Sequence, residues 1–424
     1  MNEAFLQHIW KYHLFDKTEL TASTGENIEI INVGQKNIDA GPDFFNAKVK
    51  IDDTVWAGNI EVHINSSDWI KHSHNTNKAY DNVILHVVYN NDMQIPRTNG
   101  EPIPTIELKF NKKLFENYQD LLNNEKWISC ENEINTIDEF IIDFWLNSLL
   151  IERLENKSEY ILKNLNQNNN NWEETFYQQL AKNFGTKINQ LPFEQLTKSL
   201  PLLYLAKHKN NLLQIEALLF GQASFLETRS DDDDYYSALK KEYSFLKDKF
   251  NLKPIEKHLW KFLRLRPGNF PTIRIAQFAS LIYKSSSLFS KIIETDDLTE
   301  IKKCFSASTS EYWDTHYMFN KATKKRKKRT GEVFINSLII NTIVPFLFVY
   351  SKLKDNEAYK IRALKFLERL PAEKNSIINN WKLLKMPVPN AFYSQALIQL
   401  KNEYCNKKKC LYCQIGNRII VKKQ

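Results

Sequence analysis

The chain is organised around residues 41–89, which read GPDFFNAKVKIDDTVWAGNIEVHINSSDWIKHSHNTNKAYDNVILHVVY. Three runs in it, Phe44–Ile51, Val55–Ile64 and Asn82–Tyr89, are rich in β-branched and aromatic residues and are bounded by Gly, Pro, Asn and Asp, which predicts strands. Side chains two positions apart on a strand share one face of the sheet. Glu61 and His63 are therefore expected to point the same way.

The flanking sequence extends this sheet and adds a helix in front of it. Asn2–Phe15 has apolar residues at helical spacing behind Asn2, a residue suited to cap a helix N-terminus. Ile28–Val33 and Thr105–Phe110 have the composition of strands, and Ser67–Lys71 is predicted as a short helix or a loop. Residues 1–125 are therefore predicted to form an α/β domain.

The rest of the chain has a different periodicity. From Ile137 onward, apolar residues recur mostly three and four positions apart, which is typical of amphipathic α-helices. We predict a larger α-helical domain over residues 126–400 and a basic, cysteine-containing tail over residues 401–424 packed on the rest. The fold class is accordingly α+β, and the clearest helical segments are 172–183, 193–200, 212–220, 235–250, 273–282 and 334–353.

Length and composition limit the class of protein. With 424 residues, 42% of them hydrophobic and 25% charged, the chain can bury a large core. Its richest apolar run, Phe334–Tyr350, is interrupted by Asn, Ser, Thr and Pro and falls short of the roughly 20 apolar residues that span a bilayer. The N-terminus lacks the pattern of a secretory signal. We therefore predict a cytoplasmic protein with no membrane association.

The net charge of +8 is concentrated in two segments. Lys321–Arg329 carries seven positive charges and residues 401–424 carry a net of six, which leaves the remainder of the chain negative. Such clusters suit a polyanion such as nucleic acid, although a solvated loop is the commoner explanation. Arginines interleaved with Phe262 and Phe270 could grip phosphate and stack on bases, or pair with acids between two helices. The predicted nucleic-acid contacts are Arg264, Arg266, Arg274, Lys325 and Arg326.

Asp43, Glu61 and His63 form the first candidate site. Asp43 follows the turn signal Gly41-Pro42 at the mouth of one strand, where its carboxylate could reach the face that carries the other two. Phosphodiester cleavage commonly uses carboxylates that converge on Mg²⁺ or Mn²⁺, with a basic group to position water. The alternative is that the acid and the histidine are satisfied by hydrogen bonds on a half-exposed sheet face.

Further histidines crowd the same window. His72 and His74 lie in a segment that could fold back toward Glu61 and add metal ligands, which leaves open a zinc hydrolase that uses His72, His74 and Asp43. No familiar zinc-binding spacing is present. His86 shares its strand face with apolar residues and is predicted to face the core. Structural histidines are therefore the favoured interpretation of this group.

Three of the five cysteines, Cys405, Cys410 and Cys413, lie within nine residues near the C-terminus. Thiolates at this spacing suit zinc or an iron–sulfur cluster, with Cys130 or Cys304 as a fourth ligand from elsewhere in the chain. We take Cys130 as that ligand, in a centre that acts as a structural clamp. Three unligated thiols in a basic tail are the alternative.

The acids and the histidine resemble a motif of the PD-(D/E)XK nuclease superfamily. Pro42-Asp43 stands at the start of one strand and Glu61-Val62-His63 stands on the next, behind the helix Asn2–Phe15. The resemblance implies a restriction-endonuclease-like mixed sheet, a metal-dependent nuclease activity, and Asp43 and Glu61 as metal ligands. His63 occupies the place of the superfamily's lysine, and a neutral imidazole supplies no permanent positive charge.

The chain as a whole resembles an uncharacterised bacterial family of unknown function. The segments that carry this resemblance include GPDFFNAKVKI, WAGNIEVHINSSDWIKH, YDNVILHVVY and LRPGNFPTIRIAQFA. It implies one architecture for the whole chain and adds nothing about chemistry. Our hypothesis is a metal-dependent nuclease that acts on DNA or RNA through Asp43, Glu61 and His63. The alternative is a non-catalytic nucleic-acid-binding or scaffold protein with a decayed nuclease core.

Overall fold

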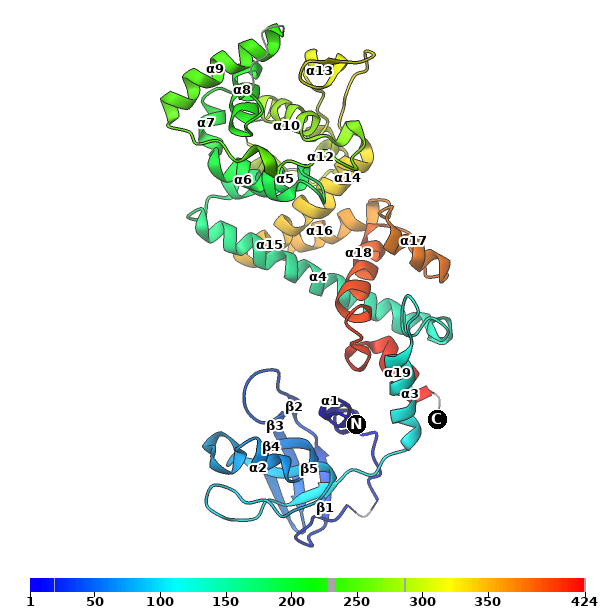
Figure 1. Cartoon of the computed structure of the whole chain (residues 1–424). Coiled ribbons are helices and arrows are strands. Elements are labelled where there is room, and N and C mark those ends of the chain that lie inside the picture. Colours follow the sequence, from blue (N-terminus) through cyan, green and yellow to red (C-terminus); the bar gives the residue numbers. More distant parts are fainter. Residues whose placement is uncertain (19, 228–232, 286, 423–424) are drawn as a thin grey trace. The chain divides into compact units, whose positions relative to one another are not determined.

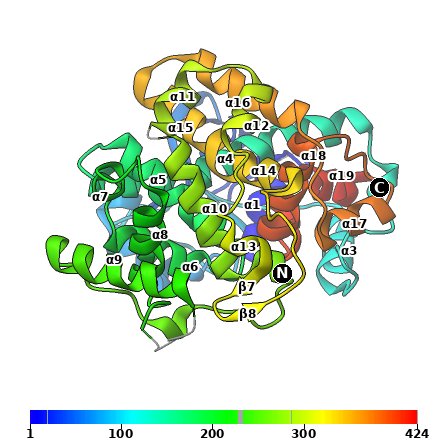
Figure 2. The same cartoon turned by 90° about the horizontal axis from the view of Figure 1, so that it is seen from above.

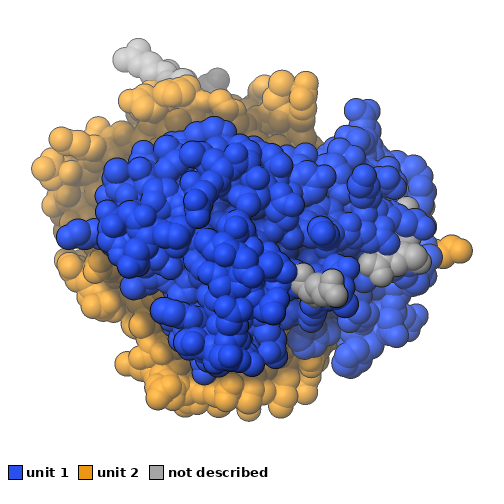
Figure 3. All heavy atoms as spheres, turned by 90° about the horizontal axis from the view of Figure 1, so that it is seen from below, with its two compact units in different colours: residues 1–145, 400–424 blue, residues 146–399 orange. Residues whose placement is uncertain are grey.

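The computed structural model describes residues 1–18, 20–227, 233–285 and 287–422, which form two compact units (Figures 1 and 3). Unit 1 comprises residues 1–145 and 400–424, and unit 2 comprises residues 146–399. The chain passes from unit 1 into unit 2 within helix α4 (Glu139–Gln167) and returns after helix α18 (Ala391–Gln399). The segment predicted as a C-terminal tail thus belongs to the same unit as the N-terminal sheet.

Unit 1 contains a six-stranded mixed sheet with helices before, within and after it. Its elements are α1 (Glu3–Lys11), β1 (Ile28–Asn32), β2 (Gln35–Lys36), β3 (Phe44–Ile51), β4 (Thr54–Asn65), α2 (Asp68–Lys71), the 3₁₀ turns His74–Thr76 and Lys78–Tyr80, β5 (Val83–Asn90), β6 (Thr105–Glu107), α3 (Lys112–Asn123), the 3₁₀ turn Ile134–Thr136, the start of α4, the π-helical segment Leu400–Cys405, the 3₁₀ turn Cys410–Tyr412 and α19 (Gln414–Lys422). The five strands predicted from the sequence are confirmed, and the short strand β2 was not foreseen.

The sheet changes from antiparallel to parallel at β4. The strands lie in the order β1-β3-β4-β5-β6, and β2 pairs with the start of β3. The β1–β3 and β3–β4 pairs are antiparallel, whereas the β4–β5 and β5–β6 pairs are parallel. A parallel neighbour requires a crossover, and the one between β4 and β5 contains α2 and two 3₁₀ turns. This crossover carries His72 and His74, so its path determines whether these two side chains reach the sheet.

Strand β5 and helix α1 supply much of the core of unit 1. Val83–Val88 are all buried, as expected for a strand that has parallel neighbours on both sides. Helix α1 begins where Asn2 Oδ1 accepts a hydrogen bond from the Phe5 N–H (2.9 Å), and its Trp10 Nε1 donates to the Val33 carbonyl (3.1 Å). The helix contacts β4 along its apolar face. Its polar side chains are therefore held at fixed positions beside that strand.

The described part of unit 2 is helical apart from one small hairpin (Figure 2), which confirms the predicted helical class of this part of the chain. Helix α10 (Pro271–Lys284) lies at its core, since every residue from Pro271 to Ile282 is buried, and it packs against α5 and α8. The other elements are α5 (Trp172–Phe184), α6 (Gln190–Ser199), α7 (Leu202–Ala206), α8 (Leu212–Gln222), α9 (Asp234–Phe250), α11 (Leu288–Glu294), α12 (Leu298–Cys304), α13 (Tyr312–Thr315), β7 (His316–Met318), β8 (Lys321–Ala322), α14 (Glu332–Leu338), α15 (Val344–Lys354), α16 (Glu357–Arg369), α17 (Ser376–Leu383) and short 3₁₀ turns at Lys257–Leu259 and Pro267–Asn269.

One helical run in unit 2 is apolar enough to cross a membrane by length and composition. It spans Glu332–Lys354 and consists of α14, a π-helical turn at Ile339–Ile343 and α15, with a mean hydropathy of 2.0. In the structure 72% of its most apolar window is buried inside the protein. Burial in the core of unit 2 accounts for this composition, and the run is the only one of its kind in the part of the chain that the structure describes.

Glu216 on α8 is a carboxyl group buried in unit 2, where it is 1% exposed. It accepts hydrogen bonds from Tyr235 Oη and from Ser310 Oγ, each at 2.8 Å. Burial nevertheless outweighs these two donors and raises the pKa of Glu216 to about 7.

We expect this carboxyl group to make unit 2 less stable as the pH rises from about 4.5 to about 7. Over that interval the unfolded chain releases the proton of Glu216 while the folded chain retains it, so the free energy of unfolding falls, by about 3 kcal/mol in full. Glu216→Gln cannot ionise and should be more stable than the wild type at pH 8 by about that amount, but not at pH 4.5. Urea unfolding at both pH values measures the difference, and an equal difference at the two would contradict the prediction.

Candidate functional site

Backbone N–H groups hold the carboxylates of Asp43 and Glu61 beside each other. Asp43 immediately precedes β3, and Glu61 lies on the neighbouring antiparallel strand β4. The Asp43 N–H donates to Glu61 Oε2 (3.0 Å), and the Val62 N–H donates to Asp43 Oδ2 (3.1 Å). These two bonds orient both acids. They leave Glu61 Oε1 directed toward the histidines.

Three imidazoles cluster beside this oxygen, and two of them are close to it. His63 lies two residues beyond Glu61 on β4, and the crossover folds back so that His72 and His74 approach His63. Glu61 Oε1 lies 3.5 Å from His63 Nε2 and 3.3 Å from His74 Nε2. His72 Nδ1 lies 3.1 Å from His63 Nε2. One ring nitrogen from each of the three histidines falls within 4.8 Å of the other two.

A fourth histidine lies behind the first. His86 is fully buried on β5, which confirms the prediction that it faces the core, and its Nε2 lies 2.8 Å from His63 Nδ1. This contact at Nδ1 orients the His63 ring, and Nε2 faces Glu61. His86 is itself held against the Trp69 indole, with ring centroids 5.5 Å apart. Tyr80 stacks on His74, with ring centroids 3.7 Å apart.

Burial disfavours the charged forms of the side chains in this cluster. Desolvation, followed by the charge of Glu61, raises the pKa of Asp43, and desolvation also raises the pKa of Glu61. Burial and the adjacent imidazoles lower the pKa of His63 to about 3. The chain therefore gathers carboxyl groups that resist ionisation and an imidazole that stays neutral. A divalent cation would reverse this balance, because it favours ionised carboxylates and uses imidazole lone pairs.

The donor set also has dimensions that suit one metal ion. Nitrogen and oxygen ligands bound at about 2.0–2.2 Å lie no more than about 4.4 Å from one another. The three ring nitrogens lie within 4.8 Å, and Glu61 Oε1 is closer than that to two of them. These spacings are compatible with three imidazole nitrogens and one carboxylate oxygen around one ion. We call Asp43, Glu61, His63, His72 and His74 the acid–histidine site.

Three residues beside this site were missed from the sequence. Gln7 Nε2 donates to Asp43 Oδ1 (2.7 Å), and Lys36 Nζ donates to Gln7 Oε1 (2.9 Å). Glu3, one helical turn before Gln7 on α1, is close enough for its charge to raise the pKa of both Asp43 and Glu61. The four-residue spacing of Glu3 and Gln7 was a usable signal, since it places both on one side of a helix. Lys36 lies on β2, which the sequence did not reveal.

The predicted nucleic-acid contacts lie in unit 2 and differ in exposure. Arg264 and Arg266 are exposed in the connection before α10, and Lys325 and Arg326 are exposed after β8. Arg274 is 7% exposed on α10. Its guanidinium donates to Asn269 Oδ1 (2.6 Å) and Gln277 Oε1 (2.9 Å) and stacks on Phe334. A nucleic-acid contact for Arg274 stays a prediction for which its buried position offers no support.

The four cysteines predicted as ligands all belong to unit 1, whereas Cys304 ends α12 in unit 2. Cys130 follows α3, Cys405 ends the π-helical segment, and Cys410 and Cys413 flank the last 3₁₀ turn. Burial raises the pKa of each of these four thiols, that of Cys413 to about 11. The structure thus places the distant Cys130 in the same unit as the C-terminal three.

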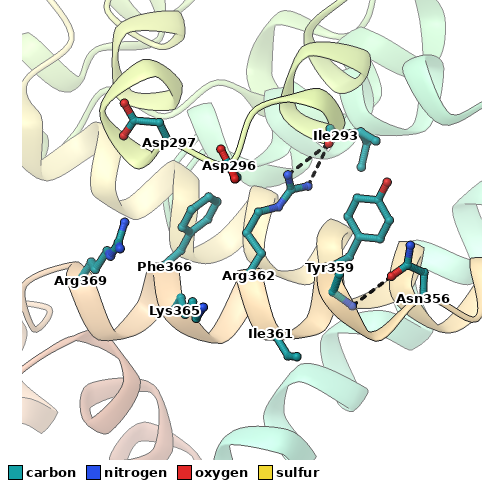
Figure 4. Close-up of a pocket in the computed structure, with 11 residues that line it drawn as sticks. Ile293, Asp296, Asp297, Asn356, Tyr359, Ile361, Arg362, Lys365, Phe366 and Arg369 are labelled. Atoms are coloured by element: carbon teal, nitrogen blue, oxygen red, sulfur yellow. Dashed lines mark hydrogen bonds between the residues drawn. The ribbon is translucent and has the colours of Figure 1, made fainter.

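A pocket in unit 2 provides a contrast (Figure 4). Arg362 on α16 donates to the carbonyl oxygens of Ile293 (3.1 and 3.2 Å) and Thr295 (3.1 Å), so its guanidinium joins two segments of the wall. The remaining charged lining residues have mixed sign and are Asp296, Asp297, Lys365 and Arg369. The described lining residues include no histidine or cysteine, and the acid–histidine site remains the better candidate for chemistry.

The chain belongs to the family described as "Protein of unknown function (DUF2851)", whose profile matches residues 3–376. This match confirms the whole-chain resemblance predicted from the sequence, and it includes the complete acid–histidine site. No curated protein and no solved structure matches the chain. The resemblance of the N-terminal part to PD-(D/E)XK nucleases stays a prediction.

Proposed function

We propose that the acid–histidine site binds a divalent metal ion and hydrolyses phosphodiester bonds of nucleic acid. The observation that carries the proposal is a cluster of three imidazoles, two of which lie close to Glu61 Oε1, beside a second buried carboxyl group. This set of side chains comes from two strands and a crossover, and a bound metal ion would use its lone pairs and charges. Without a metal ion, burying these acids and imidazoles only costs desolvation free energy.

The ligand types favour a transition metal. Two carboxylates alone led us to expect Mg²⁺ or Mn²⁺. Imidazole nitrogens suit Zn²⁺ and other transition metals, whereas Mg²⁺ prefers an all-oxygen octahedral set. Mn²⁺ accepts both carboxylate and imidazole, so we propose Mn²⁺ as the activating ion, with Zn²⁺ as the second choice.

The chain's own residues supply the remaining parts of a hydrolytic site. A bound divalent ion would lower the pKa of a coordinated water and neutralise charge that develops on phosphate. If His72, His74 and the two acids hold the ion, His63, whose Nδ1 lies against His86, is left as a neutral imidazole whose Nε2 could accept a proton from that water. Lys36, fixed through Gln7, places an ammonium group near Asp43. It offers the permanent positive charge that His63 lacks.

The phosphodiester as substrate class is supported by the arrangement of the acids. Asp43 stands directly before β3, and Glu61 and His63 stand on the adjacent strand β4, behind helix α1. This is the order of elements on which the resemblance to PD-(D/E)XK nucleases rests. A zinc hydrolase that uses His72, His74 and Asp43 is the second candidate, and the proximity of His72 and His74 to His63 favours it.

The proposal is tested on metal-stripped full-length protein supplied with Mn²⁺, Zn²⁺ or Mg²⁺. The substrates are single- and double-stranded DNA, RNA and a chromogenic phosphodiester. We expect cleavage that depends on added metal and is fastest with Mn²⁺. Hydrolysis of only the chromogenic diester, with Zn²⁺, would favour the second candidate. Intact substrates in every combination, with or without retention of nucleic acid, would refute the hydrolytic proposal.

A further inference from the structure

Four cysteines of unit 1 come from two segments that lie 275 residues apart in the sequence, counted from Cys130 to Cys405. Cys405 is within electrostatic reach of Cys130, Cys410 and Cys413, and Cys130 is within reach of Cys410 and Cys413. All are free thiols. The fold thus brings four cysteines near one another, although no three of their sulfur atoms lie within 4.8 Å of one another.

Hydrogen-bond donors are directed at these sulfur atoms. The backbone N–H groups of Ile415 and Gly416, in the first turn of α19, lie beside Cys413 and act to lower the pKa of its thiol, against the larger effect of burial. Trp145 Nε1 is buried without a hydrogen-bond partner among the described residues and acts on the same thiol in the same direction. The Ser129 side chain does the same for Cys410. N–H and O–H donors around sulfur favour the thiolate, which is the form that binds metals.

We propose that Cys130, Cys405, Cys410 and Cys413 ligate a thiophilic metal centre that clamps the C-terminal segment onto the N-terminal part of unit 1. Four thiolates are the ligand set of structural zinc and also of iron–sulfur clusters. The ligand chemistry is shared by the two, and the metal content of the protein distinguishes them. This inference goes beyond the proposed hydrolysis and does not depend on it.

The clamp has identifiable contacts on both sides. The backbone of Leu411, which lies between two of the cysteines, is close enough to His8 on α1 to act on the pKa of its imidazole, which burial lowers. Asn117 Nδ2 on α3 donates to the Ile420 carbonyl on α19 (2.9 Å). A metal centre at the cysteines would therefore tie together α1, α3 and α19, the helices that surround the end of the chain.

The same loop reaches the surroundings of the acid–histidine site. The Tyr412 hydroxyl lies 3.5 Å from Lys36 Nζ, and the ammonium group lies 5.0 Å from the centre of the Tyr412 ring. Lys36 is joined through Gln7 to Asp43. Loss of the metal centre is therefore expected to loosen α1 and Lys36 together.

The first test is the metal content of anaerobically purified full-length protein. We expect either about one zinc per chain or iron with acid-labile sulfide and broad visible absorption. Cys130→Ser and Cys410→Ser should lose this metal, whereas Cys304→Ser, the matched control in unit 2, should retain it. Glu61→Gln should retain this metal, which would show that the cysteine centre is distinct from the acid–histidine site.

Zinc is assigned to thiolates by replacing it with Co²⁺, since sulfur ligands give an intense charge-transfer band that imidazoles and carboxylates lack. Wild-type protein with neither zinc nor iron, even after reconstitution, would overturn the inference. So would equal metal content in Cys410→Ser and Cys304→Ser. The wild-type measurement is decisive even when a cysteine variant fails to fold.

The clamp itself is tested by hydrogen exchange. Residues 3–11 and 414–422 should exchange at least tenfold faster in Cys410→Ser than in Cys304→Ser, while the helices of unit 2 exchange equally in both. Unchanged exchange of α1 and α19 in a metal-free protein would show that the contacts hold without the metal, and the clamp would be refuted.

Discussion

Replacing Glu61 by glutamine is expected to lower metal-dependent phosphodiesterase activity on the order of 10³-fold while the protein stays folded. Glu61 Oε1 is the atom on which His63 and His74 converge, so the variant loses the charged ligand at the centre of the site. Glutamine retains a carbonyl oxygen that can accept the Asp43 N–H. The measurements are the rate with saturating Mn²⁺ and the Mn²⁺ affinity by calorimetry.

Two comparisons make this result specific to the site. Asp53→Asn removes an exposed carboxylate from the turn between β3 and β4 and should leave both the rate and the affinity unchanged. The thermal midpoint of Glu61→Gln should equal or exceed that of the wild type, because a carboxyl group whose pKa is raised by burial has been neutralised. Full activity in Glu61→Gln would exclude Glu61 as a ligand. Equal losses in both variants would point to a general effect of charge.

The parts of the fold that follow from local periodicity were predictable. The alternation in Phe44–Ile51 and Val55–Ile64 predicted β3 and β4 to within a residue or two. The pairing of β4 with β5 in parallel could not be read from either strand, because it depends on the path of the crossover. Strand β2 consists of two residues and carries no period at all.

The acids of the candidate site could be predicted from the sequence, but the complete set of its residues could not. Glu61 and His63 share a face by the alternation of a strand, and the structure brings Asp43 to them. His72 and His74 were favoured as structural because their spacing matches no known zinc motif. Their approach to His63 arises from a left-handed Ser73 (φ 60°) between them, which turns the crossover back toward β4. Such a turn is a property of the folded backbone and has no periodic signature.

For the cysteines, the residues themselves were predictable and their surroundings were not. The three C-terminal thiols were recognisable from their spacing alone, and Cys130 was chosen from two possible partners without a pattern to support it. The spacing of the cysteines does not show that a helix starts beside Cys413 or that a tight turn precedes this helix. Gly416 is the one sign of this arrangement in the sequence, because a side chain at its position would clash with the backbone of Cys410.

Replacing Gly416 by alanine is expected to destabilise unit 1 by about 3 kcal/mol and to remove the metal bound at the cysteines. A Cβ at this position would lie 2.3 Å from the carbonyl oxygen of Cys410 and 3.0 Å from its carbonyl carbon. Both atoms belong to the backbone of a proposed ligand, so relief requires the loop between Cys410 and Cys413 to move. Urea unfolding and elemental analysis of the variant measure the two effects.

The sign of the stability change separates this mechanism from helix propensity. Gly416 lies within α19, where alanine is otherwise favoured over glycine by up to about 1 kcal/mol. A clash with Cys410 predicts a loss of stability, whereas propensity alone predicts a gain. Gly268→Ala is the matched control, since a Cβ there meets no described atom within 4 Å, and it should change stability by no more than about 0.5 kcal/mol. A more stable Gly416→Ala protein with its full metal content would mean that the Cys410 carbonyl is free to move, and that the cysteine loop is not held as proposed.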